Sequence, residues 1–350
     1  MAHDSLDPSA PENAAEPSPA RSPTSADVAR RAGVSRATVS YVLNDVPDSR
    51  VSAETRARVQ AAADELGYTT HALARSLRAG HSDIILAPQT TLPSGPMVNR
   101  FYEGLAERLG ALGYTFVMHL DPTASGLEAA RIWASLRPAG LLVEAERISS
   151  RSLDLMRTAG TRAIVLLNET PSPLAPTLVN NDVDVGACAA EYLIARGHRR
   201  LGAVVPREAD VLKLGTERLK GVMRVANASG VPVERIDLAY DEAEAARLAA
   251  HWKASGGPTG LFTYNDEYAM LLMPALLEAG LAIPGDIALV GADNLPLCAL
   301  LRPRLTSVDK NGAAGADAAV ELVHALIQGE PTDTQAIHLL KPSIVPRASA

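Results

Sequence analysis

The stretch of sequence that decides the fold of the N-terminal domain reads Asp27-Val-Ala-Arg-Arg-Ala-Gly-Val-Ser-Arg-Ala-Thr-Val-Ser-Tyr-Val-Leu-Asn44. Apolar residues recur three and four positions apart on both sides of Gly33, and this period predicts two short helices joined by a tight turn. Ser35 can cap the second helix, and Val39 and Val42 fall on its inner face. The pattern is typical of a helix-turn-helix, whose second helix is presented on the surface.

A third helix completes a small headpiece that we expect over residues 24–70. Ser52 can cap a helix over residues 53–66, and Gly67 can end it in the left-handed backbone conformation. Thr24 can cap the first helix in an arrangement like a capping box. The same pattern also suits a three-helix bundle that binds nothing, because short helix-turn-helix patterns recur in unrelated proteins.

The outward face of the second helix carries side chains that can read DNA. Arg36 can donate two hydrogen bonds to guanine, Ala37 can touch a thymine methyl group, and Tyr41 can reach a base or a phosphate. Hydroxyl groups near helix N-termini lie where phosphate oxygens are favoured. The predicted DNA contacts that follow from the residues themselves are Ser35, Arg36, Ala37, Thr38, Tyr41 and Ser52.

Length, charge and composition bound the class of protein. The chain has 350 residues, 47% of them hydrophobic, which suits a sizeable core in two or three domains. The formal net charge is −7, yet residues 24–81 carry eight Arg against six acidic residues and form the only net-positive segment. Residues 1–23 are mostly Ala, Pro and Ser, and we expect a disordered tail there.

Two absences narrow the class further. The chain has only two cysteines, Cys188 and Cys298, which excludes a disulfide scaffold and a multi-cysteine zinc site, and we expect both thiols to be inert. No apolar stretch reaches 18 residues, and no secretory signal is visible. We therefore expect a soluble, cytoplasmic protein without a membrane span.

From Asp83 onward, short apolar strands alternate with helices. This alternation is typical of an α/β fold with parallel sheets that are covered on both faces. The pattern continues for about 265 residues, which is long for one open sheet, so we expect two similar lobes. The expected strands are 84–87, 115–119, 140–143, 163–167, 201–205, 260–263 and 287–291, and the expected helices include 97–112, 183–195, 216–228 and 268–279.

Polar residues follow several of these strands and predict a small-molecule site. Ligands of open parallel sheets bind beyond the carboxyl ends of the strands. Carboxylates, amides, one arginine near a helix start and one tyrosine suit a ligand rich in hydroxyl groups or ring nitrogens. Helix capping is the competing interpretation for polar residues after a strand, above all for Asp266. The predicted effector contacts are Asp182, Arg218, Tyr240, Asn265 and Asp293.

The quoted stretch resembles the DNA-binding headpiece of the lac repressor and galactose repressor family. Val51-Ser-Ala-Glu-Thr-Arg56 and Glu65-Leu-Gly-Tyr68 continue the resemblance, and Ala74-Arg-Ser-Leu-Arg78 is similar to that family's hinge helix. Further motifs follow in the family's order, so that the resemblance covers about residues 24–347. They are Gly197-His-Arg-Arg-Leu201, Glu217-Arg-Leu-Lys-Gly221, Tyr264-Asn-Asp-Glu-Tyr-Ala269, Pro284-Gly-Asp-Ile287, Val290-Gly-Ala-Asp293 and Leu305-Thr-Ser-Val308.

The resemblance implies a transcriptional regulator, usually a repressor, that works as a homodimer on a near-palindromic double-stranded DNA operator. It implies a hinge helix over residues 71–81 that pairs with its copy in the minor groove, where Leu77 wedges into the central base step. It also adds Asn44 and Arg75 to the DNA contacts. Packing against the effector domain is a second possible role for Leu77.

The resemblance further implies a two-lobed effector domain of the periplasmic-binding-protein type over residues 82–347. A small molecule in the cleft between the lobes controls operator affinity, either as an inducer or as a corepressor. Asp182, Arg218, Asn265 and Asp293 match effector-contacting positions of the family. Lobe 1 is expected over about 82–176 and 304–330 and lobe 2 over about 177–303, with crossings near Pro176, near Pro303 and after a helix at 311–328 that belongs to lobe 1.

Two other classes of protein compete with this interpretation. A sugar-binding receptor has the same two-lobed domain, but the headpiece and the missing signal peptide argue against it. An enzyme on a doubly wound fold is disfavoured, because the sequence lacks the common nucleophile, phosphate-binding and metal motifs. We therefore expect no catalytic residue, no cofactor and no metal ion.

Overall fold

The computed structural model describes most of the chain, which divides into two compact units, Met1–Ala79 and Gly80–Ala350. The described residues are 23–43, 51–68, 82–90, 96–121, 123–180, 182–310, 312–330, 336–338 and 342–350. Three predicted DNA contacts, Asn44, Arg75 and Leu77, lie outside them. Residues 1–22 of the expected tail and the hinge helix expected over 71–81 also lie outside the described residues.

The first unit contains three short helices, α1 (Ser25–Ala32), α2 (Arg36–Leu43) and α3 (Ala53–Leu66). Their inner faces meet in one apolar core that includes Val28, Val39 and Val59. Gly33 and Gly67 end α1 and α3 with φ angles of 67° and 63°, which glycine adopts without a steric cost. The three predicted helices and both predicted stops are confirmed.

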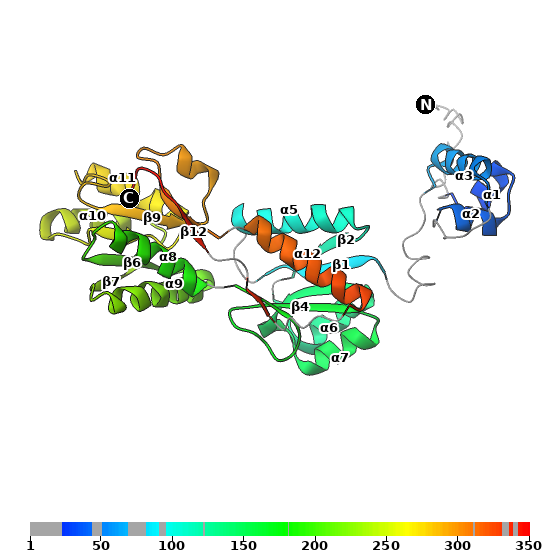
Figure 1. The fold of residues 1–350 in the computed structure, drawn as a ribbon, viewed down its shortest axis with the longest axis horizontal. Coiled ribbons are helices and arrows are strands. Elements are labelled where there is room, and N and C mark those ends of the chain that lie inside the picture. Colours follow the sequence, from blue (N-terminus) through cyan, green and yellow to red (C-terminus); the bar gives the residue numbers. More distant parts are fainter. Residues whose placement is uncertain are drawn as a thin grey trace, which may run out of the picture. The chain divides into compact units, whose positions relative to one another are not determined.

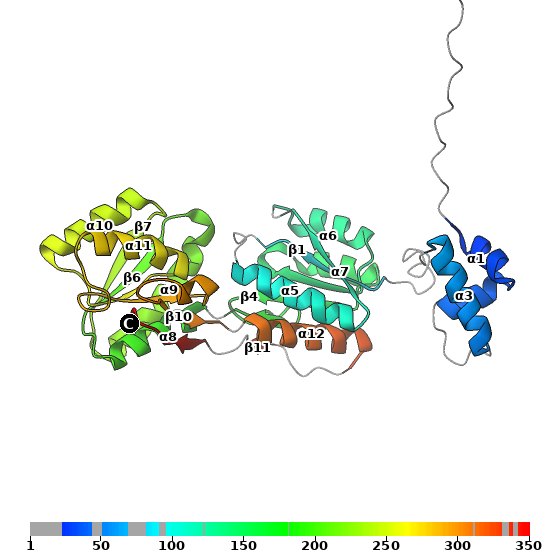
Figure 2. The ribbon, with the colours of Figure 1, turned by 90° about the horizontal axis from the view of Figure 1, so that it is seen from above.

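The second unit contains two sheets built to the same plan, each with six strands among the described residues (Figure 1). The first sheet has the order β11-β5-β4-β3-β1-β2, and its neighbouring strands are parallel. Helices α5 and α12 cover one face and α6 and α7 the other, as both ribbon views show (Figures 1 and 2). Its elements are β1 (Ile84–Pro88), α5 (Pro96–Ala111), β2 (Thr115–His119), α6 (Gly126–Ser135), β3 (Gly140–Glu144), the 3₁₀ helix η1 (Ala145–Arg147), α7 (Ser150–Thr158), β4 (Ala163–Asn168), β5 (Thr177–Val179), α12 (Gly312–Gln328) and β11 (Ala336–His338).

The second sheet has the order β12-β10-β9-β8-β6-β7. Its strands are parallel except for β12, which runs antiparallel to β10. Helices α10 and α11 cover one face, and α8 and α9 cover the other. Its elements are α8 (Asp182–Ala195), β6 (Leu201–Pro206), α9 (Ala209–Ala228), β7 (Val233–Leu238), α10 (Glu242–Ser255), β8 (Gly260–Phe262), α11 (Asp266–Glu278), β9 (Ala288–Ala292), the 3₁₀ helix η2 (Pro296–Ala299), β10 (Thr306–Asp309) and β12 (Ser343–Val345).

The crossings between the two sheets fall a few residues later than the sequence suggested. The expected crossing near Pro176 is corrected, because Thr177–Val179 still forms β5 of the first sheet. The crossing expected near Pro303 is likewise corrected, because Thr306–Asp309 forms β10 of the second sheet. Strands of three and four residues carry too little periodic signal to be found in a sequence. Helix α12 packs on the first sheet, as expected.

Helix α9 also differs from the prediction, since it begins at Ala209 and not at Thr216. The expected helix over 216–228 left Gly215 outside, but Gly215 lies inside the helix. A Cβ atom at Gly215 would lie 2.3 Å from Pro206 Cδ, so the glycine serves close packing of the helix on the end of β6. Arg218 therefore lies in the third turn of α9 rather than near its first.

Helices α8 and α9 approach closely because each contributes a glycine to their contact. A Cβ atom at Gly186 would lie 1.8 Å from the carbonyl oxygen of Arg218, and one at Gly221 would lie 1.8 Å from that of Val183. Only glycine allows this approach of two backbones. The contact fixes the position of Arg218 relative to the beginning of α8.

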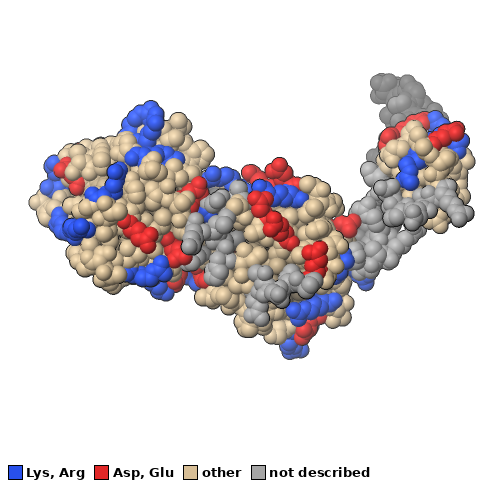
Figure 3. Space-filling view, in the orientation of Figure 1, with Lys and Arg blue, Asp and Glu red and all other residues tan. Residues whose placement is uncertain are grey.

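Among the described residues, no helix is long and apolar enough to cross a membrane. In the same part of the chain, no group of three or more His, Cys, Asp or Glu side chains is placed to hold a metal ion. Figure 3 shows Lys and Arg side chains interspersed with Asp and Glu over the drawn face of the second unit.

Candidate functional site

Helix α2 presents the face that the sequence predicts for DNA. Val39 and Val42 are buried in the headpiece core, whereas Arg36, Ala37 and Tyr41 are exposed. Tyr41 keeps 48% of its surface accessible although it is a large aromatic side chain. An exposed helix with arginine at its N-terminal end has the geometry of a helix that enters the major groove.

The hydroxyl groups predicted to contact phosphate form helix caps in the structure. The Thr38 N–H donates to Ser35 Oγ at 3.1 Å, and the two hydroxyl oxygens lie 2.9 Å apart. Ser52 Oγ accepts from the Thr55 N–H at 3.2 Å and donates to Thr55 Oγ1 at 3.0 Å. These caps order the first turns of α2 and α3, where backbone N–H groups attract anions. Phosphate contact by Ser35, Thr38 and Ser52 remains a prediction.

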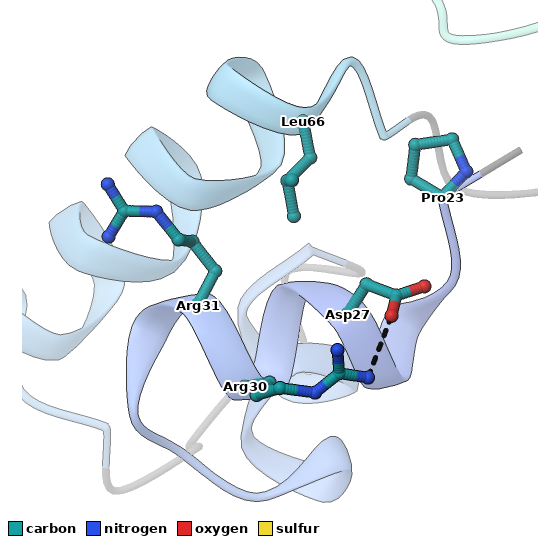
Figure 4. A pocket seen from close by; sticks show the side chains of 5 residues that line it. All are labelled: Pro23, Asp27, Arg30, Arg31 and Leu66. Carbon is teal, nitrogen blue, oxygen red and sulfur yellow. Dashed lines mark hydrogen bonds and ion pairs between the residues drawn. The ribbon is translucent and has the colours of Figure 1, made fainter. Parts of the chain in front are cut away.

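A hollow between α1 and α3 lies apart from this face of α2 (Figure 4). Asp27, at its edge, accepts from the Thr24 N–H at 2.9 Å, which is the carboxylate contact of the predicted capping box, and it also accepts from the Thr24 hydroxyl at 2.6 Å. Arg30 also pairs with Asp27 at 2.8 Å. The hollow contains no predicted DNA contact, and its lining residues are Pro23, Asp27, Arg30, Arg31 and Leu66.

In the second unit, a buried charge cluster brings together three of the predicted effector residues, Asp182, Arg218 and Asp293. Arg218 Nε donates to Asp182 Oδ1 at 2.9 Å, and neither side chain is more than 4% exposed. Lys310 Nζ donates to the same carboxylate oxygen at 3.1 Å. Arg218 Nη2 lies 3.5 Å from Asp293 Oδ1. Two cations and two anions thus balance one another in the cluster.

Pairing sets the ionisation of this cluster. Burial alone would raise the pKa of Asp182, but the charges of Lys310 and Arg218 outweigh it and hold that pKa at about 2. Burial would lower the pKa of Arg218, but the carboxylates of Asp182 and Asp293 raise it above its ordinary value. Both partners of the Asp182–Arg218 pair are therefore charged at neutral pH.

Three residues beside the cluster have positive φ angles although none is glycine. The angles are 68° at Tyr264, 94° at Asp293 and 46° at Asn294. Such backbone costs about 1–3 kcal/mol per residue and is concentrated at functional sites. Arg218 Nη1 donates to the carbonyl oxygen of Tyr264 at 2.7 Å, and the guanidinium lies 4.7 Å from the centre of that ring. Burial raises the pKa of Tyr264 to about 12, so its hydroxyl stays protonated.

Asp293 pairs with Arg218 by charge, but its Oδ1 atom still has room for a hydrogen-bond donor. Its Oδ1 atom is buried and receives no hydrogen bond from any of the described residues. A buried acceptor without a donor is unfavourable unless a ligand or water supplies one. The arrangement therefore favours a hydrogen-bond donor on a bound molecule.

Asn265, and not Asp266, caps α11, and effector contact by Asn265 remains a prediction. Asn265 Oδ1 accepts from the Tyr268 N–H at 2.9 Å and caps α11. Capping was expected of Asp266, and this is corrected: Asp266 is the first helical residue and is fully buried. The backbone of Asn265 is extended, with φ at −143°, which places Asn265 and not Asp266 at the capping position.

Tyr240 reaches the cluster only through other aromatic rings. It is 56% exposed, and its ring meets that of Tyr268 edge-on at 5.3 Å, while Tyr268 meets Tyr264 at 5.6 Å. Glu208 holds this arrangement, since the Tyr268 hydroxyl and the Tyr240 N–H, at 2.7 Å, both donate to its carboxylate. Tyr240 thus presents an exposed ring beyond the end of β7.

Comparison with known proteins decides the family. Residues 24–71 match the model of bacterial regulatory proteins of the lacI family, and residues 190–350 match that of a periplasmic binding protein-like domain. The HTH-type transcriptional repressor PurR of Photobacterium profundum is 30% identical over 333 residues, which cover 92% of this chain and 97% of the relative. The chain belongs to the lacI family of bacterial regulatory proteins.

Solved structures agree with this assignment to the lacI family. The Lac repressor dimer bound to operator and the anti-inducer ONPF matches with a TM-score of 0.75 at 25% identity, over 94% of this chain and 99% of that one. A lacI-family regulator from Silicibacter pomeroyi matches with a TM-score of 0.73 at 25% identity, over 93% and 98% of the two chains. The chain is thus a DNA-binding transcriptional repressor with an effector-binding domain, and it is not an enzyme.

The first lobe of this lacI-family protein contains a buried arginine that the sequence did not single out. Arg147 is buried and donates to the carbonyl oxygens of Gln89, Asp121 and Ala124, so that it ties together the loops after β1 and β2. Because its donors are taken by backbone carbonyl oxygens, Arg147 orders these loops.

Polar contacts between described residues join the first lobe to the second. Lys213 of α9 pairs with Glu146 of η1. Arg100 Nη2 of α5 donates to the carbonyl oxygen of Asp293 at 3.3 Å. The Asp182 N–H donates to Glu169 Oε2 at 3.5 Å, and burial together with the Asp182 charge raises the pKa of Glu169 to about 7. These contacts lie around the charge cluster, and a change in the angle between the lobes would alter them.

Two residues of this region, Lys310 and Glu208, could not be recognised as site residues from the sequence. Lys310 follows β10, a strand that was not predicted, so nothing marked it as a residue at a strand end. Glu208 lies before α9, whose beginning was predicted seven residues too late. Both would have been candidates had those two boundaries been found.

Proposed function

We propose that this repressor binds a neutral small molecule rich in hydroxyl groups, of the sugar or nucleoside type, between its two lobes. The observation that carries the proposal is the balanced cluster at Arg218, in which Asp293 Oδ1 is ion-paired with Arg218 but accepts no hydrogen bond. A charged ligand would leave an uncompensated charge beside a buried and neutral set of ions, which is costly. A hydroxyl or ring N–H would satisfy Asp293 without adding charge.

The proposed roles of the site residues follow from their positions in the cluster and from the hydrogen bonds they already make. Arg218 and Asp293 contact the ligand, and the exposed ring of Tyr240 stacks on it. Asp182 holds Arg218 from behind, because its oxygens already accept from Arg218, Lys310 and Asn180 and none of its surface is exposed. Asn265 fixes the start of α11 beside Tyr264.

On the DNA side, we propose that the protein is a cytoplasmic homodimer on a near-palindromic operator. Arg36, Ala37 and Tyr41 then read base edges, and Ser35, Thr38 and Ser52 lie against the phosphates. The dimeric Lac repressor on its operator supports this arrangement. Asn44, Arg75 and the wedge Leu77 keep the roles that the family resemblance implies.

The coupling between the two sites is proposed to run through the angle between the lobes. A ligand bound to Arg218 and Asp293 changes the contacts of Asp293 with Arg100 and those of α9 with η1. Altered lobe geometry changes how the hinge segments meet in the dimer, and short helices form only when they are packed. Linkage requires that operator DNA change ligand affinity by the same factor.

Operator binding in the presence of candidate ligands tests the proposal. Fluorescence anisotropy would measure operator affinity with D-ribose, D-glucose, cellobiose, adenosine and inosine as probes. One of these is expected to change the affinity about fivefold or more. Asp293→Asn is expected to keep ligand-free operator affinity and to lose the response, because its amide no longer provides two acceptor oxygens.

The matched control is Asp237→Asn. Asp237 lies on β7 and pairs with Arg235 at the surface, where charge contributes little. This variant is expected to respond like the unmodified protein. If Asp293→Asn lost operator binding and kept its ligand affinity, the assignment of Asp293 would be wrong.

A further inference from the structure

Behind Asp293 lies a set of side chains that the proposed ligand does not reach. We call Asp266, Ser307 and Arg347 the buried frame. Asp266 Oδ2 accepts from the Leu295 N–H at 2.8 Å, and its Oδ1 accepts from the Ser307 hydroxyl at 2.6 Å. Asp266, Ser307 and their shared hydrogen bond are buried, with no exposed surface on either residue.

The buried frame forms hydrogen bonds with both residues that follow Asp293, Asn294 and Leu295. Ser307 Oγ accepts from the Asn294 N–H at 3.0 Å. Arg347 Nη2 donates to Asn294 Oδ1 at 2.6 Å, and its Nη1 donates to the carbonyl oxygen of Leu305 at 2.7 Å. The backbone of Asn294 and Leu295 is thereby fixed by hydrogen bonds from α11, β10 and the segment after β12.

This restraint acts where the backbone is least favourable. Asp293 and Asn294 are consecutive non-glycine residues with φ angles of 94° and 46°. Strained backbone persists only where the surroundings hold it. The hydrogen bonds of the buried frame to the next two N–H groups supply that restraint.

The buried frame also lies in close contact with β9. A Cβ atom at Gly291 would lie 2.1 Å from Asp266 Oδ1, so only glycine at position 291 leaves room for the Asp266 carboxylate. Burial raises the pKa of Asp266 to about 6, against the hydrogen bonds from Ser307 and Leu295. Cys298 and Asp293 are the other ionisable groups that face it.

We propose that Asp266 is a positioning residue for effector recognition, which through the Leu295 N–H and Ser307 holds Asp293 in the conformation that turns its carboxylate toward Arg218. The inference rests on the proposed effector site. It assigns Asp266 no contact with the ligand. Ser307 and Arg347 act with it on Asn294.

Hydrogen exchange of the ligand-free full-length protein, resolved for the amides of Asn294 and Leu295, tests the proposal. In Asp266→Ala both amides are expected to exchange about 10- to 100-fold faster, because a hydrogen bond to a charged acceptor is lost and a strained segment is released. In Asp266→Asn the remaining amide oxygen can still accept from the Leu295 N–H. The exchange rates of both amides are then expected to lie within about threefold of those in the unmodified protein. Amides of β6 and β8 are expected to stay unchanged.

Controls separate positioning from general stabilisation. Asp286→Ala removes an exposed carboxylate of the same lobe that accepts from the Ala282 N–H at 2.8 Å, and it is expected to leave Asn294 and Leu295 protected. Should Asp266→Ala fail to fold, Ser307→Ala is the substitute and is expected to release the Asn294 amide. Unchanged protection of both amides, or an equal loss over the whole second lobe, would overturn the proposal. Because no ligand is present, neither outcome bears on the proposed effector.

Discussion

Replacement of Arg218 by methionine tests the charge cluster at the centre of the effector site. Methionine keeps much of the length of the side chain but removes the donors to Asp182 and to the Tyr264 carbonyl. Asp182 then stays fully buried with Lys310 as its remaining cation. We expect Arg218→Met to fold and to be clearly less stable than the unmodified protein.

The loss of stability in Arg218→Met can be estimated in two ways. The pKa of Asp182 lies near 2 rather than 3.8, which at about 1.36 kcal/mol per unit corresponds to about 2 kcal/mol of stabilisation at neutral pH. Breaking a buried ion pair by removing one partner costs about 3–5 kcal/mol. Since Lys310 remains, we expect about 3 kcal/mol, which lowers the melting temperature of a domain of this size by about 6–12 °C.

Scanning calorimetry at pH 7.5 measures this difference, with Arg224→Met as the matched control. Arg224 pairs with Asp184 at 2.8 Å across the same two helices, but its side chain is 57% exposed. An exposed pair contributes at most about 1 kcal/mol. Equal, small decreases of the melting temperature in the two variants would refute the claim that burial makes the Arg218–Asp182 pair contribute more than an exposed pair.

The difference in stability between the unmodified protein and Arg218→Met is also expected to depend on pH. The folded pKa of Asp182 is lowered, so its contribution is complete above the ordinary value of 3.8 and is lost as the pH falls through about 2. The difference in melting temperature between the unmodified protein and Arg218→Met is therefore expected to narrow between pH 5 and pH 3. A difference that widens over this range would contradict the assigned charges.

Three further predictions concern the headpiece and the helix packing. Arg36→Ala is expected to cost about 1–3 kcal/mol on the true operator and to relax specificity at one base pair, measured by anisotropy on operator variants; an equal loss on all sequences would make Arg36 a phosphate contact. Gly221→Ala places a Cβ atom 1.8 Å from the Val183 carbonyl oxygen and is expected to lower the melting temperature and abolish the ligand response, whereas Gly110→Ala, with nothing within 4 Å, is expected to do neither. Ser52→Ala is expected to destabilise the headpiece by about 1 kcal/mol in thermal unfolding followed by circular dichroism, and no change would mean that its cap to α3 is replaced by water.

Helices with clear ends and an apolar period could be predicted from the sequence. Gly33 and Gly67 mark helix ends by a backbone conformation that other residues avoid, and both stops are confirmed. The outward direction of Arg36 and Tyr41 followed from the period of Val39 and Val42 alone. Local rules suffice where a segment's own residues decide its structure.

The effector site was predicted in part, because its remaining members depend on contacts distant in the sequence. Arg218 meets Asp182 across two helices, and only the glycine contact between α8 and α9 sets that distance. Whether a polar residue after a strand caps, supports or contacts a ligand depends on one position of the helix start, as Asn265 and Asp266 show. Lys310 pairs with Asp182 over a separation of 128 residues, which no periodic pattern can reveal.

Selection of bound sequences from a random pool of double-stranded DNA, with purified full-length protein at moderate salt, tests the central claim most directly. We expect enrichment of a near-palindrome whose two half-sites flank a flexible central step, as a dimer of headpieces with paired hinge helices requires. Repeating the selection with the probe ligands present covers the case in which a ligand promotes binding. Enrichment of a single half-site would contradict the dimer, and no enrichment under either condition would contradict the assignment of α2 as a DNA-reading helix.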